Sequence, residues 1–237
     1  TKKIELKKYL GERTNNWAEY EEAQSDFAEW LEKKKGVAIA MRAKAALALV
    51  RLGTLKHLAA AGKLTVVKQW IRDFLDETDK KLVVFGIHRD IVKQLHSDFP
   101  QDSAMIIGGI PEPEREAKKQ CFIHDDKCRI MFGNIKAIGE GIDGLQEVCH
   151  TVAFVEIGWA PAEHDQAEDR VLRIGQKSSR VDSYYFVGRG TIEEDNLDLI
   201  QEKREIIEKI VDGSTSGDVR SDIQTTLMRR IASTATE

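Results

Sequence analysis

The sequence predicts an α/β fold in which helices cover both faces of a central parallel sheet. Between about residues 62 and 190, five short apolar runs alternate with helix-like stretches, which is the pattern of βαβ units. The apolar runs are continuous rather than alternating, as in strands that are buried on both faces. The expected strands are 82–87, 104–107, 129–132, 151–155 and 181–187.

Helical patterns lie between and after these strands. They are expected over 89–97, 112–122, 139–145 and 164–174, and a long amphipathic helix is expected over 191–212. Thr191 and Glu194 form a capping box at the start of that last helix. A parallel sheet of this kind places its functional loops outside the carboxyl ends of its strands.

The first 60 residues look helical and predict an appendage to the sheet domain. Aromatic residues recur there at near-helical spacing, and an alanine-rich run follows over 37–61. Gly36 and Gly53 are expected to separate the helices. We interpret the aromatic positions as a packed face rather than a ligand cage; they are Trp17, Tyr20, Phe27, Trp30 and Leu31. The predicted organisation is a helical appendage over 1–60, an α/β lobe over 61–212 and a polar tail over 213–237 that could hold one short helix.

Composition limits the classes of function. The 237 residues are 41% hydrophobic and 32% charged, with a net charge of −4, so no overall basic field draws nucleic acid to the chain. Any DNA binding must come from a local patch or from a partner lobe. Arg42 and Lys44 break the longest weakly apolar run, so no membrane partner is expected. Because the chain begins with Thr, without Met and without a signal peptide, we expect a piece of a longer protein.

Three cysteines form no disulfide framework, which fits a reducing compartment. The expected location is therefore intracellular: cytoplasmic for a bacterial or phage protein, nuclear for a eukaryotic one. Cys121, His124 and Cys128 could form part of a metal site that Cys149 and His150 complete. That spacing matches no familiar zinc pattern, and cysteine is often a small buried hydrophobe, so no metal is expected.

The segment Q-A-E-D-R-V-L-R-I-G-Q, from Gln166 to Gln176, is the most distinctive in the chain. It places Arg170 and Arg173 three residues apart, on one face of the expected helix. Guanidinium groups bind phosphate oxygens bidentately and never lose their charge. Arginine pairs are also common on solvated faces, so the spacing alone decides nothing. In this chain both arginines are expected to point at solvent.

The full pattern Q-x-x-D-R-x-x-R-I-G-Q resembles motif VI of the SWI/SNF group of superfamily-two helicases, the ATP-driven motors that move along double-stranded DNA. With Trp159 and Pro161 upstream, the order most resembles the HARP-like annealing-helicase subgroup, although Leu172 stands where a His is common. The resemblance covers about residues 40 to 210. It implies a RecA-like three-layer fold with a central parallel sheet, the C-terminal lobe of the motor. The early helices would be its protrusion and the tail its bracing segment.

Two strand ends are candidates for DNA contact. The strand 82–87 runs into His88 and Arg89 at a helix start, where backbone N–H groups and a guanidinium can hold a phosphate. A purely capping role for His88 is equally open from these residues alone. The segment resembles the family's motif IV, which faces DNA. Gly108 and Gly109 end the next strand and resemble the following D-G motif, with Gly108 in place of Asp; glycines there would let a phosphate backbone approach.

The stretch G-E-G-I-D follows the third strand. A G-x-G turn is weak evidence, because glycines simply make tight turns. Its position after an apolar strand, however, is that of a phosphate cradle. It resembles the family's motif V, which implies that Asp143 contacts ribose. By the resemblance the nucleotide side consists of Gly139, Glu140, Gly141, Asp143 and Gln166, while Asn134 and Lys136 lie toward DNA.

The resemblance implies ATP hydrolysis, for which the chain lacks some parts. The reaction needs a G-x-x-x-x-G-K-[ST] loop and an acidic D-E-x-x motif, yet Gly62-Lys63 is followed by Leu64, which has no hydroxyl. ATP with Mg²⁺ would therefore be held mainly by an absent N-terminal RecA-like lobe of the same polypeptide. Arg170 and Arg173 would be the arginine fingers of a translocase on double-stranded or forked DNA. The chain alone is predicted to be inactive.

Three other interpretations stay open. A non-catalytic RecA-like module that binds nucleotide or protein would keep the fold, but the intact spacing of the arginines and of Gly139 to Asp143 argues against it. An RNA helicase would carry a G-R-x-G-R version of motif VI. A dinucleotide-binding oxidoreductase would need a G-x-G-x-x-G after the first strand, which the sequence lacks.

Overall fold

The computed structural model describes residues 3–11, 17–27, 29, 30, 33, 47–139, 142–209 and 225–227. The chain divides into two compact units, the first made of 1–11 and 64–187 and the second of 12–63 and 188–237. The division falls within the long helix α4 (Leu47–Glu77), between Lys63 and Leu64. Within the ranges described, none of the helices has the length and apolar character that a membrane crossing demands.

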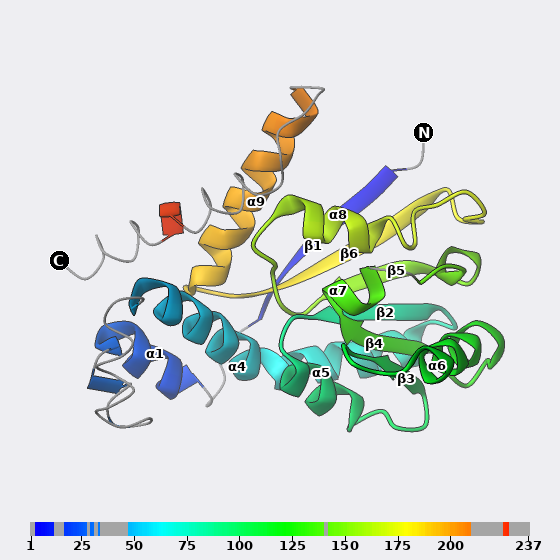
Figure 1. Ribbon diagram of the computed structural model, residues 1–237, viewed down its shortest axis with the longest axis horizontal. Coiled ribbons are helices and arrows are strands. Elements are labelled where there is room, and N and C mark those ends of the chain that lie inside the picture. Colours follow the sequence, from blue (N-terminus) through cyan, green and yellow to red (C-terminus); the bar gives the residue numbers. More distant parts are fainter. Residues whose placement is uncertain are drawn as a thin grey trace. The chain divides into compact units, whose positions relative to one another are not determined.

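A six-stranded sheet forms the centre of the first unit, in the order β1-β6-β5-β2-β4-β3 (Figure 1). The pairings β3–β4, β4–β2, β2–β5 and β5–β6 are all parallel. All five strands expected from the sequence are confirmed. The strands are β1 (Lys3–Gly11), β2 (Lys81–Gly86), β3 (Ser103–Ile106), β4 (Ile130–Asn134), β5 (Cys149–Phe154) and β6 (Arg180–Gly188).

The sixth strand corrects the prediction that residues 1–60 are helical throughout. Residues 3–11 form β1, which lies beside β6 at the edge of the sheet. Ile4 and Leu6 alternate there with charged residues, a period of two that suits a strand better than a helix. Gly53 does not separate helices either. It lies inside α4, where no atom comes within 4 Å of the position that a Cβ would take, so packing does not require a glycine.

Helices cover both faces of the sheet, as β6 shows. Tyr184 and Phe186 point to one face and pack on Trp70 of α4, with ring centroids 4.8 and 5.1 Å apart. Tyr185 points to the other face, where its hydroxyl donates to Glu168 of α8 (Pro161–Glu168) at 2.9 Å. Because successive strand residues alternate between faces, these contacts confirm the three-layer α/β architecture.

Two of the connecting helices match the prediction and two do not. Helices α5 (Arg89–His96) and α6 (Glu112–His124) lie where the sequence placed them. The helix expected over 139–145 is wrong. Helix α7 (Ile135–Gly139) ends where the expected helix begins, and only a single 3-10 turn, η3 (Leu145–Glu147), follows. Gly144 precedes that turn with φ +96°, which a continuing right-handed helix does not allow.

The helix expected over 164–174 is also corrected, because α8 ends at Glu168. The chain then makes tight turns, in which the N–H groups of Val171 and Leu172 both donate to the Glu168 carbonyl. Gly175 follows with φ +101°, so the backbone leaves helical geometry for good. Arg170 and Arg173 therefore lie on turns and not on one face of a helix.

The second unit contains α1 (Ala18–Ser25), the part of α4 up to Lys63, and α9 (Ile192–Lys209), which confirms the helix expected over 191–212. The Tyr20 hydroxyl accepts the N–H of Ile192 at 2.9 Å. Lys63 and Glu193 form a buried ion pair, with N–O distances of 2.5 and 2.6 Å. These contacts bind the start of α9 to α1 and α4.

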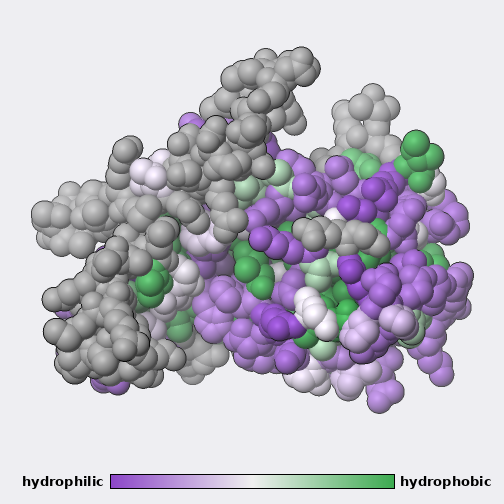
Figure 2. Space-filling model, viewed as in Figure 1, coloured by the Kyte–Doolittle hydropathy of each residue, from purple (hydrophilic) through white to green (hydrophobic). Residues whose placement is uncertain are grey.

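The aromatic residues of the second unit form a packed face, as interpreted from the sequence. Trp17, Tyr20, Phe27 and Trp30 are all buried, whereas Leu31 lies outside the described residues. The short helix expected in the tail lies mostly outside them too, apart from 225–227. On the face shown in Figure 2 the described surface is mainly hydrophilic, with apolar colour confined to small separate patches.

Candidate functional site

Most of the predicted DNA-contact residues gather at one edge of the sheet. Strands β2, β3, β4 and β5 end at Gly86, Ile106, Asn134 and Phe154. Because these strands are parallel, their carboxyl ends share that edge. One group of residues occupies it, and a second lies away from it, because Gln176 of that second group donates to the carbonyl of Cys149 at the amino end of β5. We call the second group, 169–176, the arginine turn, and we call the first group the His88 cluster; its members are His88, Arg89, Gly108, Gly109, Asn134 and Glu156.

Glu156 is the centre of the His88 cluster, and no sequence pattern had singled it out. Its side chain is buried, and one carboxylate oxygen accepts the N–H groups of Ile87 at 2.6 Å and His88 at 2.8 Å. The other oxygen pairs with Nδ1 of the His88 ring. Burial acts to raise the pKa of Glu156, but the hydrogen bond and charge of His88, with the two N–H groups, outweigh it and hold the pKa below its ordinary value.

These contacts decide what His88 does at the start of α5. Its backbone is the N-cap of the helix, with φ −82° and ψ 132°, but its side chain makes no capping hydrogen bond. The ring is turned to Glu156 instead. Asn134, which is also buried, donates from Nδ2 to the Ile87 carbonyl at 2.8 Å. Asn134 therefore fixes the end of β2, and its amide nitrogen is already engaged.

Arg89 and Gly109 lie side by side in the same cluster. Arg89 is exposed, and its Nη2 lies 3.2 Å from where a Cβ would stand on Gly109. Gly109 has φ +86°, so a side chain there would be strained as well as crowded. Gly108 faces open space by the same measure. The guanidinium thus lies along bare backbone at an accessible edge of the sheet.

Lys136 lies on α7, two residues beyond Asn134, and is exposed. Helix α7 is tied to α6, because Arg115 donates from Nη2 to the Ala137 carbonyl. The ammonium group of Lys136 is therefore carried by a short helix that a hydrogen bond joins to α6.

The arginine turn contacts the loop that the sequence assigned to nucleotide. Nη1 of Arg170 donates to the carbonyl of Ile142 at 3.3 Å. Nη1 of Arg173 lies 2.9 Å from Oδ1 of Asp143. The expectation that both arginines point at solvent is therefore corrected. The structure brings Arg170, Arg173 and Asp143 together although about 30 residues separate them in the chain.

The two arginines differ in how they are satisfied. The side chains of Asp143 and Arg173 are 71% and 39% exposed, so water and ions reach this pair. The hydrogen bond from Arg173, followed by the N–H of Gly144, holds the pKa of Asp143 below its ordinary value. Nε of Arg170 is buried and has no hydrogen-bond partner within the residues that the structure describes. Arg170 therefore has an unused donor, whereas Arg173 is paired with an accessible carboxylate.

The other residues assigned to nucleotide are not shown in contact with the Arg173–Asp143 pair. Gly139 is buried at the last position of α7. Glu140 and Gly141 lie outside the described residues. Gln166 is exposed on α8, and within the described part of the chain no hydrogen bond joins its side chain to Asp143.

Two side chains of the distinctive segment hold the arginine turn in place. The buried Glu168 carboxylate accepts the hydroxyls of Ser183 at 2.7 Å and Tyr185 at 2.9 Å. Gln176 donates from Nε2 to the carbonyls of Cys149 at 2.7 Å and Val171 at 2.9 Å. Neither anchoring role was predicted from the sequence. Glu156 had a signal that could have revealed it, since it is a lone carboxylate directly after a buried strand.

Two of the three cysteines, Cys128 and Cys149, are buried, and the side chain of Cys128 is hydrogen-bonded with that of Cys121. Burial raises the pKa of Cys128 and of Cys149 to about 12, so neither is a thiolate at neutral pH. Cys121 is exposed. Among the residues described, no three His, Cys, Asp or Glu side chains are grouped so as to hold a metal ion.

Comparison with known proteins gives a consistent picture. Residues 62–175 match the family model of the helicase conserved C-terminal domain. Among curated relatives, the cattle (Bos taurus) "DNA annealing helicase and endonuclease ZRANB3" is 29% identical over 157 residues, which cover 65% of this chain and 14% of the relative. The Xenopus tropicalis "SWI/SNF-related matrix-associated actin-dependent regulator of chromatin subfamily A-like protein 1" is 29% identical over 151 residues, 62% of this chain and 16% of the relative. The chain thus spans only about one sixth or less of these relatives.

Solved structures share the fold. The Sulfolobus solfataricus SWI2/SNF2 ATPase C-terminal domain has a TM-score of 0.65 and 18% identity, and the match covers 97% of this chain and 98% of that one. The ATPase core of the same name in complex with dsDNA has a TM-score of 0.69 and 19% identity, over 96% of this chain and 50% of that one. At such identities the likeness concerns the fold, and it confirms the RecA-like class.

Proposed function

Because this chain belongs to the SWI/SNF group of superfamily-two ATPases and carries the C-terminal RecA-like lobe of such a protein, we propose that it is the second motor lobe of a translocase on double-stranded or forked DNA. In this role the arginine turn acts on ATP, and the His88 cluster holds the phosphates of one DNA strand. The first motor lobe belongs to the same polypeptide. The ATPase activity and its DNA substrate are properties of that whole protein.

One observation carries this proposal: Arg173 lies 2.9 Å from Asp143. The pair joins the two segments that the resemblance assigns to nucleotide, although β5 and α8 lie between them in the chain. Both side chains remain accessible, so a phosphate oxygen can replace the carboxylate as the partner of Arg173. Asp143 can then accept a ribose hydroxyl.

ATP with Mg²⁺ is the cofactor of this role, and cleavage of its γ-phosphate is the chemistry that it supplies. The residues present fit the phosphate end of that group. Nε of Arg170 is a buried donor without an acceptor in the described residues, and the guanidinium of Arg173 lies in an exposed pair. Arg170 and Arg173 would bind and neutralise phosphate oxygens, while Mg²⁺ and the remaining contacts belong to the first lobe.

Ile174 supports a lobe interface at the arginine turn. Its side chain is fully exposed, directly after Arg173. An apolar side chain in that position gains about 1.5–3 kcal/mol when a second surface covers it. Closure of a first lobe over the turn would bury Ile174 and bring the arginines to the nucleotide in the same movement.

DNA is held by charge and backbone rather than by base edges. Arg89 and Lys136 are exposed cations at the carboxyl edge of the sheet, and Gly109 leaves room for a phosphate. His88 is fixed by Glu156, so its ring is presented in one orientation. Contacts of this kind do not depend on sequence, and they weaken as salt rises.

DNA-stimulated ATP hydrolysis by the full-length protein tests the motor role. Arg170→Ala should lower turnover by about 10³-fold or more, the range known for arginine fingers. Arg180→Ala is the matched control, because Arg180 is an exposed arginine at the start of β6 that pairs with Asp182 and not with the loop at Asp143, and it should leave turnover unchanged. Normal turnover of the Arg170→Ala protein would instead favour a non-catalytic nucleotide- or protein-binding module.

The salt dependence of DNA binding tests the proposed phosphate contacts of Arg89 and Lys136. Removing a cation that neutralises one phosphate should reduce the slope of log K against log salt by about 1. Lys136→Ala and Arg89→Ala should each show this change on duplex and forked DNA, with no change in sequence preference. Equal slopes for the variants and the parent would contradict the proposed grip.

A further inference from the structure

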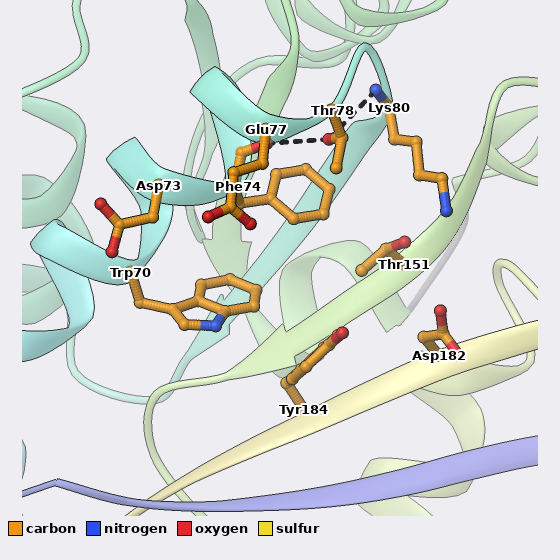
Figure 3. Close-up of a pocket in the computed structure, with 9 residues that line it drawn as sticks. All are labelled: Trp70, Asp73, Phe74, Glu77, Thr78, Lys80, Thr151, Asp182 and Tyr184. Carbon is orange, nitrogen blue, oxygen red and sulfur yellow. Dashed lines mark hydrogen bonds between the residues drawn. The ribbon is translucent and has the colours of Figure 1, made fainter.

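A hollow of about 310 Å³ lies between α4 and the sheet, on the face that Trp70 covers (Figure 3). Its lining comes from α4, from the segment that leads into β2, and from the first residues of β5 and β6. Lys80 directly precedes β2, and Asp182 is the third residue of β6. The hollow is therefore at the amino ends of the strands, the edge opposite the His88 cluster.

Aromatic rings form one part of the lining. The ring centroids of Trp70 and Tyr184 lie 4.8 Å apart, and those of Trp70 and Phe74 lie 5.6 Å apart and nearly parallel. In Figure 3 these rings occupy the side of the hollow toward α4 and β6. Ring faces carry negative partial charge, which attracts a cation placed within about 6 Å.

Carboxylates form the other part. Asp73 and Glu77 stand on exposed positions of α4, four residues apart and thus on one face of the helix. Asp182 lines the hollow from β6 and is buried, with Nε of the exposed Arg180 at 3.2 Å from its Oδ1. Lys80 is the one cation among the lining residues. With the Arg180 guanidinium on Asp182, three carboxylates face two cations, and the hollow keeps a net negative charge that Asp73 and Glu77 supply on the α4 side.

We propose that this hollow binds an arginine side chain from a basic segment of a partner protein. A guanidinium is flat enough to stack on an indole or phenol ring, and its edge donates to carboxylates. Arg180 already places a guanidinium on Asp182 at this rim. DNA is excluded as the occupant, because its phosphates would meet carboxylates. The volume is at the lower end of the range for ligand pockets and suits one long side chain.

The site does not depend on the proposed motor role. The partner would engage the edge of the sheet opposite the His88 cluster, so it could bind while that cluster holds DNA. It would be recognised by charge and ring stacking together, and lysine, which lacks the flat face, would bind more weakly.

Titration of the 237-residue chain with a defined probe tests this site. The probe is a seven-residue peptide with three arginines separated by glycines, and the neutral control replaces each arginine by citrulline. Binding is followed by fluorescence anisotropy of the labelled peptide and by the backbone amide NMR shifts of Asp73, Glu77, Asp182 and Tyr184. The arginine peptide should shift these amides, and the citrulline peptide should not.

A matched pair of variants separates the hollow from general acidity. The double variant Asp73→Asn, Glu77→Gln removes two lining charges and should lower the affinity for the arginine peptide by about tenfold or more. Asp76→Asn with Asp79→Asn removes two exposed charges nearby that do not line the hollow, and it should leave affinity within about twofold. Equal losses in both double variants, equal binding of the citrulline peptide, or shifts confined to other surfaces would each overturn the proposal.

Discussion

Asp143 and Arg173 form an ion pair in which Oδ1 of the carboxylate lies 2.9 Å from Nη1 of the guanidinium. The pair links the loop between α7 and η3 to the turn after α8, and a second bond from Arg170 to the Ile142 carbonyl runs beside it. In this chain the Asp143 carboxylate is the partner of the Arg173 guanidinium, which we assign to a phosphate of ATP. Arg173 must exchange one anionic partner for another when it acts.

The titration of Asp143 should report this pair. Arg173→Ala should raise the pKa of Asp143 toward its ordinary value of about 3.9, although the N–H of Gly144 still lowers it. Because the folded-state pKa is lowered, the pair contributes at pH above the unfolded value and is lost as pH falls through the folded value. Carboxyl NMR of the chain measures the shift. Arg180→Ala is the control, and an unchanged Asp143 pKa in Arg173→Ala would show that the pair does not persist in solution.

Glu156 should be the most stability-sensitive residue of the His88 cluster. Glu156→Gln removes the charge that accepts two N–H groups and the His88 ring, and it should lower the free energy of unfolding by about 1–3 kcal/mol. The pKa of Glu156 is lowered by folding, so its contribution is present above the unfolded value of about 4.3 and is lost as pH falls below it. Urea unfolding at pH 7 and at pH 3.5 measures both effects.

The control for that experiment is Glu147→Gln, which removes an exposed carboxylate from η3. It should change the unfolding free energy by less than about 0.5 kcal/mol. In DNA-binding assays Glu156→Gln should also lower the affinity for DNA, because the His88 ring loses its fixed orientation. A Glu156→Gln chain as stable as the parent at pH 7 would refute the central place of this carboxylate.

Ile174 should matter for activity and not for folding. Ile174→Ser replaces a fully exposed apolar side chain, so the unfolding free energy should change by less than about 0.5 kcal/mol. In the full-length protein the same change should slow DNA-stimulated ATP hydrolysis, because lobe closure then buries less apolar surface. Thermal unfolding and steady-state turnover measure the two. Unchanged turnover would place Ile174 outside the lobe interface.

The thiols should differ sharply in reactivity. Cys121 is exposed, whereas burial raises the pKa of Cys128 and of Cys149 to about 12. Iodoacetamide at pH 8 should therefore modify Cys121 first, and the other two only after unfolding, because the thiolate is the nucleophile. Peptide mass spectrometry at timed intervals follows the three sites. Rapid labelling of Cys149 in the folded chain would contradict its placement in β5.

The sequence was a good guide where a physical signal was local. Continuous apolar runs predicted all five parallel strands, and their order fixed which loops share the functional edge. Residues at strand ends, such as His88 and Gly109, could be selected for the same reason. The boundaries of α8 could not be predicted, because Glu168 ends that helix with hydrogen bonds to β6 that only the folded sheet supplies.

Contacts between residues far apart in the chain could not be predicted from the sequence. The resemblance assigned Arg173 and Asp143 to the same nucleotide, but nothing in their own segments shows that they form an ion pair with each other. The strand at 3–11 was not predicted, because its alternating pattern is short and is followed closely by helical patterns. Glu156 was passed over because a single charge after a strand has many harmless explanations until its three contacts are known.

The most direct test of the account is single-turnover ATP hydrolysis on DNA by the full-length protein with Arg173→Ala, combined with ATP and DNA affinities measured separately. We predict that hydrolysis falls by about 10³-fold or more while both affinities change by less than about tenfold, because the guanidinium acts on charge that develops during the reaction. Hydrolysis within a few-fold of the parent would contradict the assignment of Arg173 to the nucleotide.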